Sequence, residues 1–250
     1  MNVNDIICLG AEPIALVNYL ALEKARSELV RNVMIGLRQG ALEAGIAIVS
    51  GETAIMPDVV RGFDLAATVI GLVRKDRIIS GEETKPGDTV LGLRSSGIHS
   101  NGLTLARKLL LKDRLNREIA RELLRPTRIY VKQITHLLKT TLEIHGLAHI
   151  TGGAYSKLKR IGRRAKVGFL LDRLPPPQPI FTKIQNRGQI SDREMYRTFN
   201  MGIGFLVICP AKLEKRVQSL LPEAQRVGHV TEALGVAVSV DGKRVEIESY

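Results

Sequence analysis

The chain has 250 residues, of which 44% are hydrophobic and 25% charged, a balance typical of a soluble globular protein with one large or two modest domains. The formal net charge of +12 raises nucleic acid as a partner, but only 4% of residues are aromatic and tryptophan is absent, so platforms for base stacking are scarce. No stretch approaches the ~20 apolar residues of a membrane span, and no secretory signal is recognisable. We therefore expect a cytoplasmic protein with neither a membrane nor a nucleic-acid partner.

The basic residues are scattered along the chain except for one cluster in its second half. It consists of Lys157, Lys159, Arg160, Arg163, Arg164 and Lys166. We interpret it as a solvated helix face with the loop that follows, in preference to an RNA-binding stripe. A substrate that carries phosphate would also benefit from a positive field, so the charge alone does not select the partner.

The first third of the chain alternates between helical and strand patterns. We expect a short helix over 3–9, a strand over 14–20, a long helix over 23–44, a short buried strand over 46–49 and a longer strand over 65–73. Gly45 should end the long helix. The side chains predicted to form the buried stripe of that helix are Leu29, Val33, Ile35, Leu37 and Leu42.

The turn signal Lys85-Pro86-Gly87-Asp88 marks a predicted domain boundary, with an N-terminal domain over 1–84 and a C-terminal domain over 85–250. Beyond it the patterns predict strands over 89–93, 167–171 and 203–208, helices over 100–112, 116–124 and 128–141, and a hairpin over 236–248 around Asp241-Gly242. Helices and strands mixed in both halves indicate an α/β (α+β) protein of two domains.

Short polar segments at the ends of these elements are candidates for chemistry. Asn4-Asp5 lies in the first helix, and Ser50-Gly51-Glu52-Thr53 follows the short strand. Two carboxylates brought together from separate elements can hold Mg²⁺, which prefers oxygen ligands and phosphate partners. Taken singly, Asp5 is equally well explained as a helix-end charge and Glu52 as a loop carboxylate.

Two further segments lead from a strand into a helix, over 95–102 and 149–153. Backbone N–H groups at a helix start, with hydroxyls beside them, suit a phosphate or carboxylate. Ser100 is also expected to cap its helix, and a lone histidine such as His149 is more often structural than catalytic. The segment 194–204 ends in glycines, which allow another group to approach the backbone closely.

Taken together in chain order, these segments resemble the phosphoribosylformylglycinamidine cyclo-ligase (aminoimidazole ribonucleotide synthetase) family. The matching motifs are Val3-Asn4-Asp5-Ile6, Gly10-Ala11-Glu12-Pro13, Gly51-Glu52-Thr53-Ala54, Met56-Pro57, Ser95-Ser96-Gly97, His99-Ser100-Asn101-Gly102, Pro126-Thr127-Arg128-Ile129-Tyr130-Val131, Ala148-His149-Ile150-Thr151-Gly152-Gly153 and 195–204. The resemblance implies the two-domain synthetase-like fold and a homodimer in which the N-terminal sheets of two copies form a closed barrel. It also implies ATP with Mg²⁺, and formylglycinamidine ribonucleotide as the nucleotide substrate of an ATP-dependent ring closure in purine biosynthesis.

The resemblance also implies roles for individual residues. Those expected in catalysis are His149, Asp5 and Glu52, the last two as Mg²⁺ ligands. Those expected to bind ATP are Asn4, Asp5, Glu52, Thr151, Gly152 and Gly153. Those expected to hold the nucleotide substrate are Ser96, Gly97, His99, Ser100, Asn101, Thr198 and Asn200.

The chain also departs from the family pattern. Family members carry a glycine-rich segment with a lysine, and an Asp-Gly-Val-Gly-Thr-Lys strand, before the position of Met1, so the N-terminal domain is expected to be incomplete. Ile55 stands where a glutamate is usual, which puts the number of metal ions in question. Three alternatives follow: a non-catalytic nucleotide-binding subunit or truncated relative, another ATP-dependent synthetase or kinase of the superfamily, and a basic nucleic-acid-binding protein.

Overall fold

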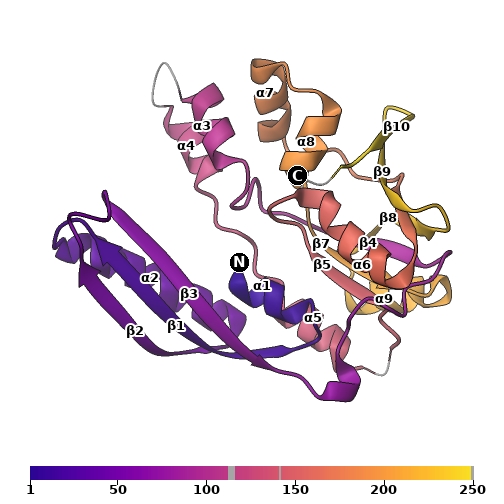
Figure 1. The fold of residues 1–250 in the computed structure, drawn as a ribbon, viewed down its shortest axis with the longest axis horizontal. Helices are drawn as coiled ribbons and strands as arrows, with labels where there is room; N and C mark the ends of the chain where they lie inside the picture. Colours follow the sequence, from indigo (N-terminus) through magenta and orange to yellow (C-terminus); the bar gives the residue numbers. More distant parts are fainter. Residues whose placement is uncertain (112–115, 141, 249–250) are drawn as a thin grey trace. The chain divides into compact units, whose positions relative to one another are not determined.

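The computed structural model describes residues 1–111, 116–140 and 142–248. The chain divides into two compact units: Met1–Ile78 with Ile129–His136 forms the first, and Ile79–Arg128 with Leu137–Tyr250 forms the second (Figure 1). This division differs from the predicted one because the segment Ile129–His136 belongs to the first unit. A buried hydrogen bond holds it there, since the Tyr130 N–H donates to Asn4 Oδ1 over 3.0 Å.

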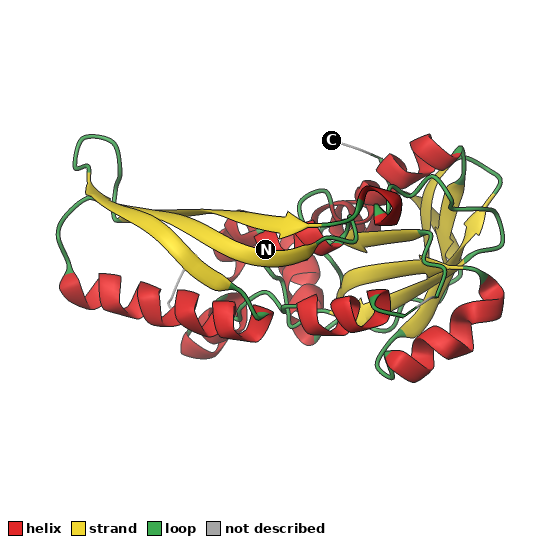
Figure 2. Cartoon of the chain, turned by 90° about the horizontal axis from the view of Figure 1, so that it is seen from below, coloured by secondary structure: helices red, strands yellow, loops and turns green. Residues whose placement is uncertain are grey.

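The described part of the first unit contains a three-stranded sheet with the order β2-β1-β3. Its strands are β1 (Glu12–Leu22), β2 (Ala47–Ile55) and β3 (Phe63–Leu72). β2 runs parallel to β1, which requires a crossover, and helix α2 (Ser27–Ala44) supplies it along one face of the sheet (Figure 2). β3 is antiparallel to β1, and the short helix α1 (Asn2–Ile7) packs against both of these strands.

Two predictions for the first unit are wrong in detail. β2 is an exposed edge strand rather than a short buried one, and it continues through Ser50-Gly51-Glu52-Thr53, which was expected to form a loop. Pairing with β1 along its whole length extends the strand. The α2 stripe is also only partly correct: Ile35 and Leu42 are 56% and 57% exposed, because the helix buries its small residues Ala41 and Ala44 instead. Gly45 ends α2 as predicted, with a left-handed φ of 73°.

The described part of the second unit is built around a seven-stranded sheet with the order β10-β9-β6-β8-β4-β7-β5. Neighbouring strands are antiparallel except for the pair β6 and β9. The strands are β4 (Thr89–Arg94), β5 (Gly146–His149), β6 (Gly168–Leu171), β7 (Ile203–Cys209), β8 (Gln225–Thr231), β9 (Gly235–Val240) and β10 (Lys243–Glu246). The β9–β10 hairpin turns at Asp241-Gly242 as predicted, with both φ angles positive.

Helices complete the second unit, and its core contains buried aromatic side chains such as Phe169, Phe181 and Phe199. The helices that the structure describes in this unit are α3 (Leu103–Leu110), α4 (Arg117–Leu123), α6 (Leu158–Ala165), α7 (Pro179–Gly188), α8 (Asp192–Thr198) and α9 (Glu214–Leu220). Helix α5 (Val131–Leu138) begins in the first unit. The predicted helix ends at Lys112 and Thr141 lie outside the described residues. Of the helices that the structure describes, none is both long and apolar enough to cross a membrane.

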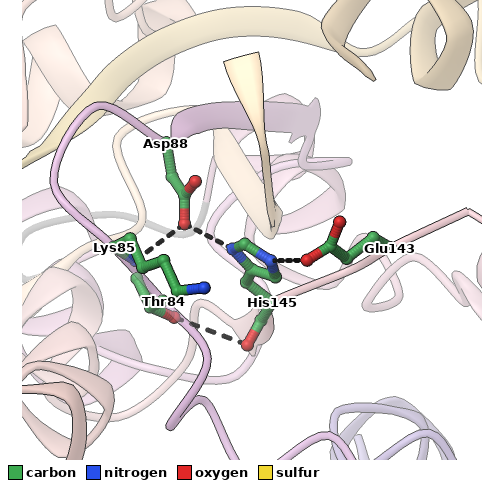
Figure 3. Close-up of polar contacts among 5 residues, drawn as sticks. All are labelled: Thr84, Lys85, Asp88, Glu143 and His145. Atoms are coloured by element: carbon green, nitrogen blue, oxygen red, sulfur yellow. Dashed lines mark hydrogen bonds and ion pairs between the residues drawn. The ribbon is translucent and has the colours of Figure 1, made fainter. Parts of the chain in front are cut away.

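Buried His145, which precedes β5, holds the segment before β4 in place through hydrogen bonds (Figure 3). His145 Nδ1 lies 2.6 Å from Asp88 Oδ2, and its Nε2 lies 2.8 Å from Glu143 Oε1. Asp88 Oδ2 also accepts from the Lys85 N–H over 2.8 Å, while Thr84 Oγ1 donates to the His145 carbonyl over 3.4 Å. Burial opposes protonation of the imidazole, but the hydrogen bonds and charges of the two carboxylates outweigh it and raise the pKa of His145.

Candidate functional site

The loop that follows β4 in the second unit is organised by the carboxamide of Asn200. Asn200 Nδ2 donates to the carbonyls of Gly97 and Ile98 over 2.9 and 3.0 Å, and its Oδ1 accepts from Ser95 Oγ over 2.9 Å and from the Gly202 N–H over 2.8 Å. A carboxamide has two N–H donors and two acceptor lone pairs, so all four positions are used. Asn200 therefore shapes the loop in this structure, and its predicted role in binding the substrate stays a prediction.

His99 lies in this loop in an unusual backbone conformation. Its φ is 63°, the left-handed region that residues other than glycine enter rarely and at a cost of about 1–2 kcal/mol. His99 Nε2 accepts from the Ser96 N–H over 3.1 Å, which stabilises that conformation and the neutral ring. Burial, and then the nearby His149, lower the pKa of His99 to about 3. Near neutral pH His99 is therefore an uncharged hydrogen-bonding group.

His149, the predicted catalytic residue, ends β5 and is 2% exposed. Its ring stacks on Phe205 with a centroid separation of 6.3 Å and an interplanar angle of 28°, and its centroid lies 6.5 Å from that of His99. The structure thus brings together two histidines that are 50 positions apart in the sequence. The catalytic role of His149 stays a prediction.

The loop Thr151-Gly152-Gly153 follows His149 directly, and Lys157 reaches back to it. Lys157 Nζ donates to Thr151 Oγ1, and Gly153 takes a left-handed φ of 79°. A Cβ placed on Gly152 would lie 3.7 Å from Asn101 Oδ1, so the predicted ATP-binding loop and the predicted substrate loop are neighbours. Lys157 was expected to belong to a solvated helix face. The sequence feature that could have indicated its contact with Thr151 is its position six residues after Thr151, where a helix begins.

Asn101 and Thr198, both predicted to bind the substrate, lie in contact with each other. Asn101 Nδ2 donates to the Thr198 carbonyl, and Thr198 Oγ1 donates to Glu194 Oε1 over 2.8 Å. The residues that follow them in the chain, Gly102 and Phe199, also meet. A Cβ on Gly102 would lie 2.2 Å from Phe199 Cε1, so this position has room only for glycine. Gly102 itself, with a φ of 78°, is the N-cap of α3.

Two serines of this loop have different environments. Ser96 Oγ donates to the Pro126 carbonyl over 2.6 Å, and Arg125 Nη1 donates to the Ser96 carbonyl over 3.2 Å. The segment before α5 therefore supports the Ser96 backbone. Ser100 is exposed, and it is not the helix cap that the sequence predicted, because α3 begins at Leu103 with Gly102 as its N-cap.

The remaining candidates, Asn4, Asp5 and Glu52, lie in the first unit. Asn4 is fully buried in α1, and its Oδ1 accepts the Tyr130 N–H described above. Asp5 is exposed on the same helix. Glu52 is exposed on β2, where its Oε1 accepts from the Thr53 N–H over 3.1 Å.

Glu52 lines a pocket of about 370 Å³ on the three-stranded sheet. The polar side chains around this pocket are those of Asn18, Tyr19, Ser50 and Thr68, and Asp5 is not among its lining residues. These carboxylate, amide and hydroxyl oxygens are of the kind that Mg²⁺ accepts together with phosphate oxygens and water. Among the described residues, no group of three or more His, Cys, Asp or Glu side chains is placed to hold a metal. Convergence of Asp5 and Glu52 on one ion stays a prediction.

Gly51, beside Glu52, is required by the packing of the sheet. A Cβ at this position would lie 2.7 Å from Asn18 Oδ1 and 3.0 Å from the Asn18 carbonyl oxygen, closer than real contacts allow. Asn18 is buried, so its carboxamide occupies the space that a larger residue would need. The close packing against Asn18 therefore explains why the first residue of the Gly-Glu-Thr motif is a glycine in this chain.

Comparison with known proteins places these residues in a family. The family models for the N-terminal and C-terminal domains of "AIR synthase related protein" match residues 1–73 and 85–241. A phosphoribosylformylglycinamidine cyclo-ligase from Methanocaldococcus jannaschii is 50% identical over 250 residues, with 94% of this chain and 71% of that protein covered. The chain belongs to the phosphoribosylformylglycinamidine cyclo-ligase family. The cyclo-ligase of Pyrococcus furiosus is 51% identical over 247 residues, with 95% and 72% covered.

Solved structures confirm the fold. Hydrogenase maturation protein HypE in complex with ATP superposes with a TM-score of 0.78 at 20% identity, covering all of this chain and 77% of that one. AaThiL complexed with AMPPCP and TMP gives a TM-score of 0.70 at 20% identity, with 100% and 76% covered. The prediction of a two-domain α/β synthetase-like fold and the resemblance on which it was based are both confirmed.

Proposed function

We propose that this protein catalyses the ATP-dependent cyclisation of formylglycinamidine ribonucleotide to aminoimidazole ribonucleotide in de novo purine biosynthesis. The observation that carries the proposal is the identity of about 50%, over nearly the whole chain, with proteins named phosphoribosylformylglycinamidine cyclo-ligase. The geometry of the second unit supports it, because the predicted ATP loop at 151–153 and the predicted substrate loop at 95–101 are neighbours there.

The proposed chemistry passes through a phosphorylated intermediate. The formyl oxygen of the substrate attacks the γ-phosphorus of ATP, and ADP leaves. The ribose-linked nitrogen then attacks the formyl carbon, the C–O bond breaks, and the oxygen departs as part of inorganic phosphate. Such a reaction needs positioning and charge neutralisation more than covalent participation by the protein.

Each group of residues has a proposed part in this reaction. Thr151, Gly152 and Gly153 contact ATP, while Ser96, Gly97, His99, Ser100 and Asn101 hold the ribonucleotide, with Thr198 beside them. His149 stabilises the phosphorylated intermediate or moves a proton. Asn200 acts indirectly, by holding the loop at Gly97 and Ile98 in place. Asn4 also acts indirectly, by holding the segment at Tyr130.

ATP is the proposed phosphoryl donor, and Mg²⁺ the proposed metal. HypE in complex with ATP and AaThiL complexed with AMPPCP share the fold, which supports a nucleotide site on this scaffold. The pocket at Glu52 offers oxygen ligands that suit Mg²⁺, with Asp5 proposed as a second ligand. When bound, Mg²⁺ would neutralise charge on the transferring phosphoryl group. Chelation by EDTA should abolish turnover.

We also propose that the protein is a cytoplasmic homodimer that associates through the sheet of the first unit. Its strands expose large apolar side chains, among them Phe63, Ile70 and Leu72, which are 49%, 48% and 66% exposed, and exposed apolar surface is typical of interaction sites. Light scattering should show a dimer, and Ile70→Lys should shift it to monomer. Leu234→Lys, at a 71% exposed position of the second unit, is the matched control. Equal masses for both variants would contradict this interface.

The enzymatic proposal is tested by ADP release that depends on formylglycinamidine ribonucleotide. The purified chain is incubated with ATP and Mg²⁺, with and without the ribonucleotide, and the aminoimidazole product is followed by mass spectrometry. Stoichiometric ADP and product support the proposal. Tight ATP binding without turnover would favour a non-catalytic nucleotide-binding subunit, and turnover with a different acceptor would favour another member of the superfamily.

A further inference from the structure

The side chain of Gln178 reaches from the start of α7 to the loop that follows β4. Gln178 occupies the N-cap position of α7, but its side chain makes no capping hydrogen bond to that helix. Its Nε2 instead donates to the Ser95 carbonyl over 2.9 Å and to Ser95 Oγ over 3.3 Å. The two residues are 83 positions apart in the sequence, so this contact ties the start of a helix to the loop that contains predicted substrate-binding residues.

Ser95 is the residue through which this contact acts. It is 7% exposed, its N–H donates to the Gly202 carbonyl over 2.9 Å, and its Oγ donates to Asn200 Oδ1 over 2.9 Å. The segment that precedes β7 therefore holds the N–H and the hydroxyl of Ser95. The Ser95 carbonyl is held by the Gln178 carboxamide instead.

One peptide group connects Gln178 to His99. The Ser95 carbonyl and the Ser96 N–H belong to the same planar peptide unit, so they turn together. Gln178 Nε2 donates to the carbonyl end of this unit, and the N–H end donates to His99 Nε2 over 3.1 Å. Rotation of the unit would break both hydrogen bonds. Gln178 therefore stabilises the orientation of the peptide that binds the His99 ring.

The other end of the Gln178 carboxamide is not satisfied. Gln178 Oε1 is buried and has no hydrogen-bond donor among the residues that the structure describes. Reversing the amide would place this oxygen against the Ser95 carbonyl, and both atoms are acceptors. A buried acceptor without a donor costs free energy, and such a group in a native protein calls for an explanation. We explain it by the need for an N–H donor at the Ser95 carbonyl.

We propose that Gln178 is a positioning residue for the ribonucleotide, which acts by fixing the peptide group between Ser95 and Ser96 and, through it, His99. This inference rests on the proposed function, in which Ser96, Gly97 and His99 hold that substrate. The role of Gln178 is indirect, because its donor is used by Ser95 and its acceptor is buried.

Two variants of Gln178 and one matched control test this role. Gln178→Met keeps the length of the side chain but removes the donor, and Gln178→Glu keeps its shape but replaces the donor with an oxygen. The control is Gln218→Met, since Gln218 is a half-buried residue of α9 whose Nε2 also donates to a backbone carbonyl, that of Ala224, over 3.2 Å.

Binding and backbone opening are measured separately on the full chain. Calorimetry gives the Kd of formylglycinamidine ribonucleotide and the Kd of ATP with Mg²⁺, each in the absence of the other, so that no turnover takes place. Amide hydrogen exchange reports the opening of the segment over 95–101, and thermal unfolding checks the fold of each variant.

The expected result is a selective loss of affinity. Gln178→Met should raise the Kd of the ribonucleotide about tenfold, as loss of one buried hydrogen bond should, and leave the Kd of ATP within about twofold of the parent value. Amide exchange over 95–101 should become faster. Gln218→Met should match the parent chain in all of these measurements.

Gln178→Glu adds a test by rescue. Near neutral pH its carboxylate cannot donate to the Ser95 carbonyl, so its affinity for the ribonucleotide should fall at least as far as that of Gln178→Met. Burial raises the pKa of a carboxyl group, and near pH about 5 its protonated form can donate. Relative to the parent chain at the same pH, most of the affinity should then return.

The proposal is overturned if Gln178→Met binds the ribonucleotide within about twofold of the parent chain, or if exchange over 95–101 is unchanged. Equal losses of affinity for the ribonucleotide and for ATP would also overturn it, since they would indicate a general structural role. The same holds if the parent chain binds no ribonucleotide. If Gln178→Met does not fold, the absence of recovery in Gln178→Glu at low pH overturns it. Failure of the proposed function is a separate result: no substrate-dependent ADP release, although the ribonucleotide still binds in a manner that requires Gln178.

Discussion

Replacing Asn200 with leucine tests whether this residue builds the site or merely lines it. Leucine has nearly the same shape, but it makes none of the four hydrogen bonds of 2.8–3.0 Å that the carboxamide makes. At about 1 kcal/mol each, their loss should lower the free energy of unfolding by about 4 kcal/mol. The groups that would lose these hydrogen bonds, on Ser95, Gly97, Ile98 and Gly202, are buried, so water does not readily replace the carboxamide.

Urea unfolding of the parent chain, Asn200→Leu and Asn186→Leu measures this effect. Asn186 is exposed on α7, so its replacement should change the free energy of unfolding by less than about 0.5 kcal/mol. A destabilisation below about 1 kcal/mol for Asn200→Leu, combined with complete loss of ribonucleotide binding, would contradict a structural role for Asn200. In that case Asn200 would contact the substrate directly rather than position the loop.

The remaining predictions concern a titrating group and a steric constraint. His145 has a raised pKa when folded, so its stabilisation is fully present below the unfolded pKa of about 6.5 and is lost as pH rises through the folded value. In urea unfolding, His145→Gln should therefore destabilise more at pH about 5.5 than at about 8.5, and equal destabilisation at the two pH values would contradict this. Gly102→Ala should lower the free energy of unfolding by about 1–3 kcal/mol more than Gly242→Ala does. Both glycines have a positive φ, of 78° and 76°, but only a Cβ on Gly102 would clash with Phe199. Equal losses of stability in thermal unfolding would contradict this.

Much of the secondary structure could be predicted because it depends on local pattern. Gly45 defines the end of α2, and Asp241-Gly242 defines the β9–β10 turn. β2 could not be bounded in this way, because its continuation through Glu52 depends on pairing with β1. The assignment of Ile129–His136 to the first unit is equally non-local, since the Tyr130 N–H bonds to a residue 126 positions away.

The candidate site was predictable as a set of loops but not as a set of contacts. Glycine and polar residues at strand ends identified the segments over 95–102 and 149–153 from the sequence. The function of each side chain depends on what it meets in space. Asn200 is saturated by hydrogen bonds within the protein, and Lys157 contacts Thr151 because a tight turn reverses the chain. Neither fact has a signature in composition or periodicity.

The proposed reaction depends on transfer of a phosphoryl group to the formyl oxygen of the substrate, and an isotope experiment tests this step most directly. Formylglycinamidine ribonucleotide labelled with ¹⁸O at the formyl group is turned over with unlabelled ATP, and the inorganic phosphate released is analysed by mass spectrometry. Each phosphate is expected to carry one ¹⁸O atom, because in the proposed reaction the formyl oxygen leaves attached to phosphorus. Unlabelled phosphate, with the ¹⁸O recovered in water, would contradict it.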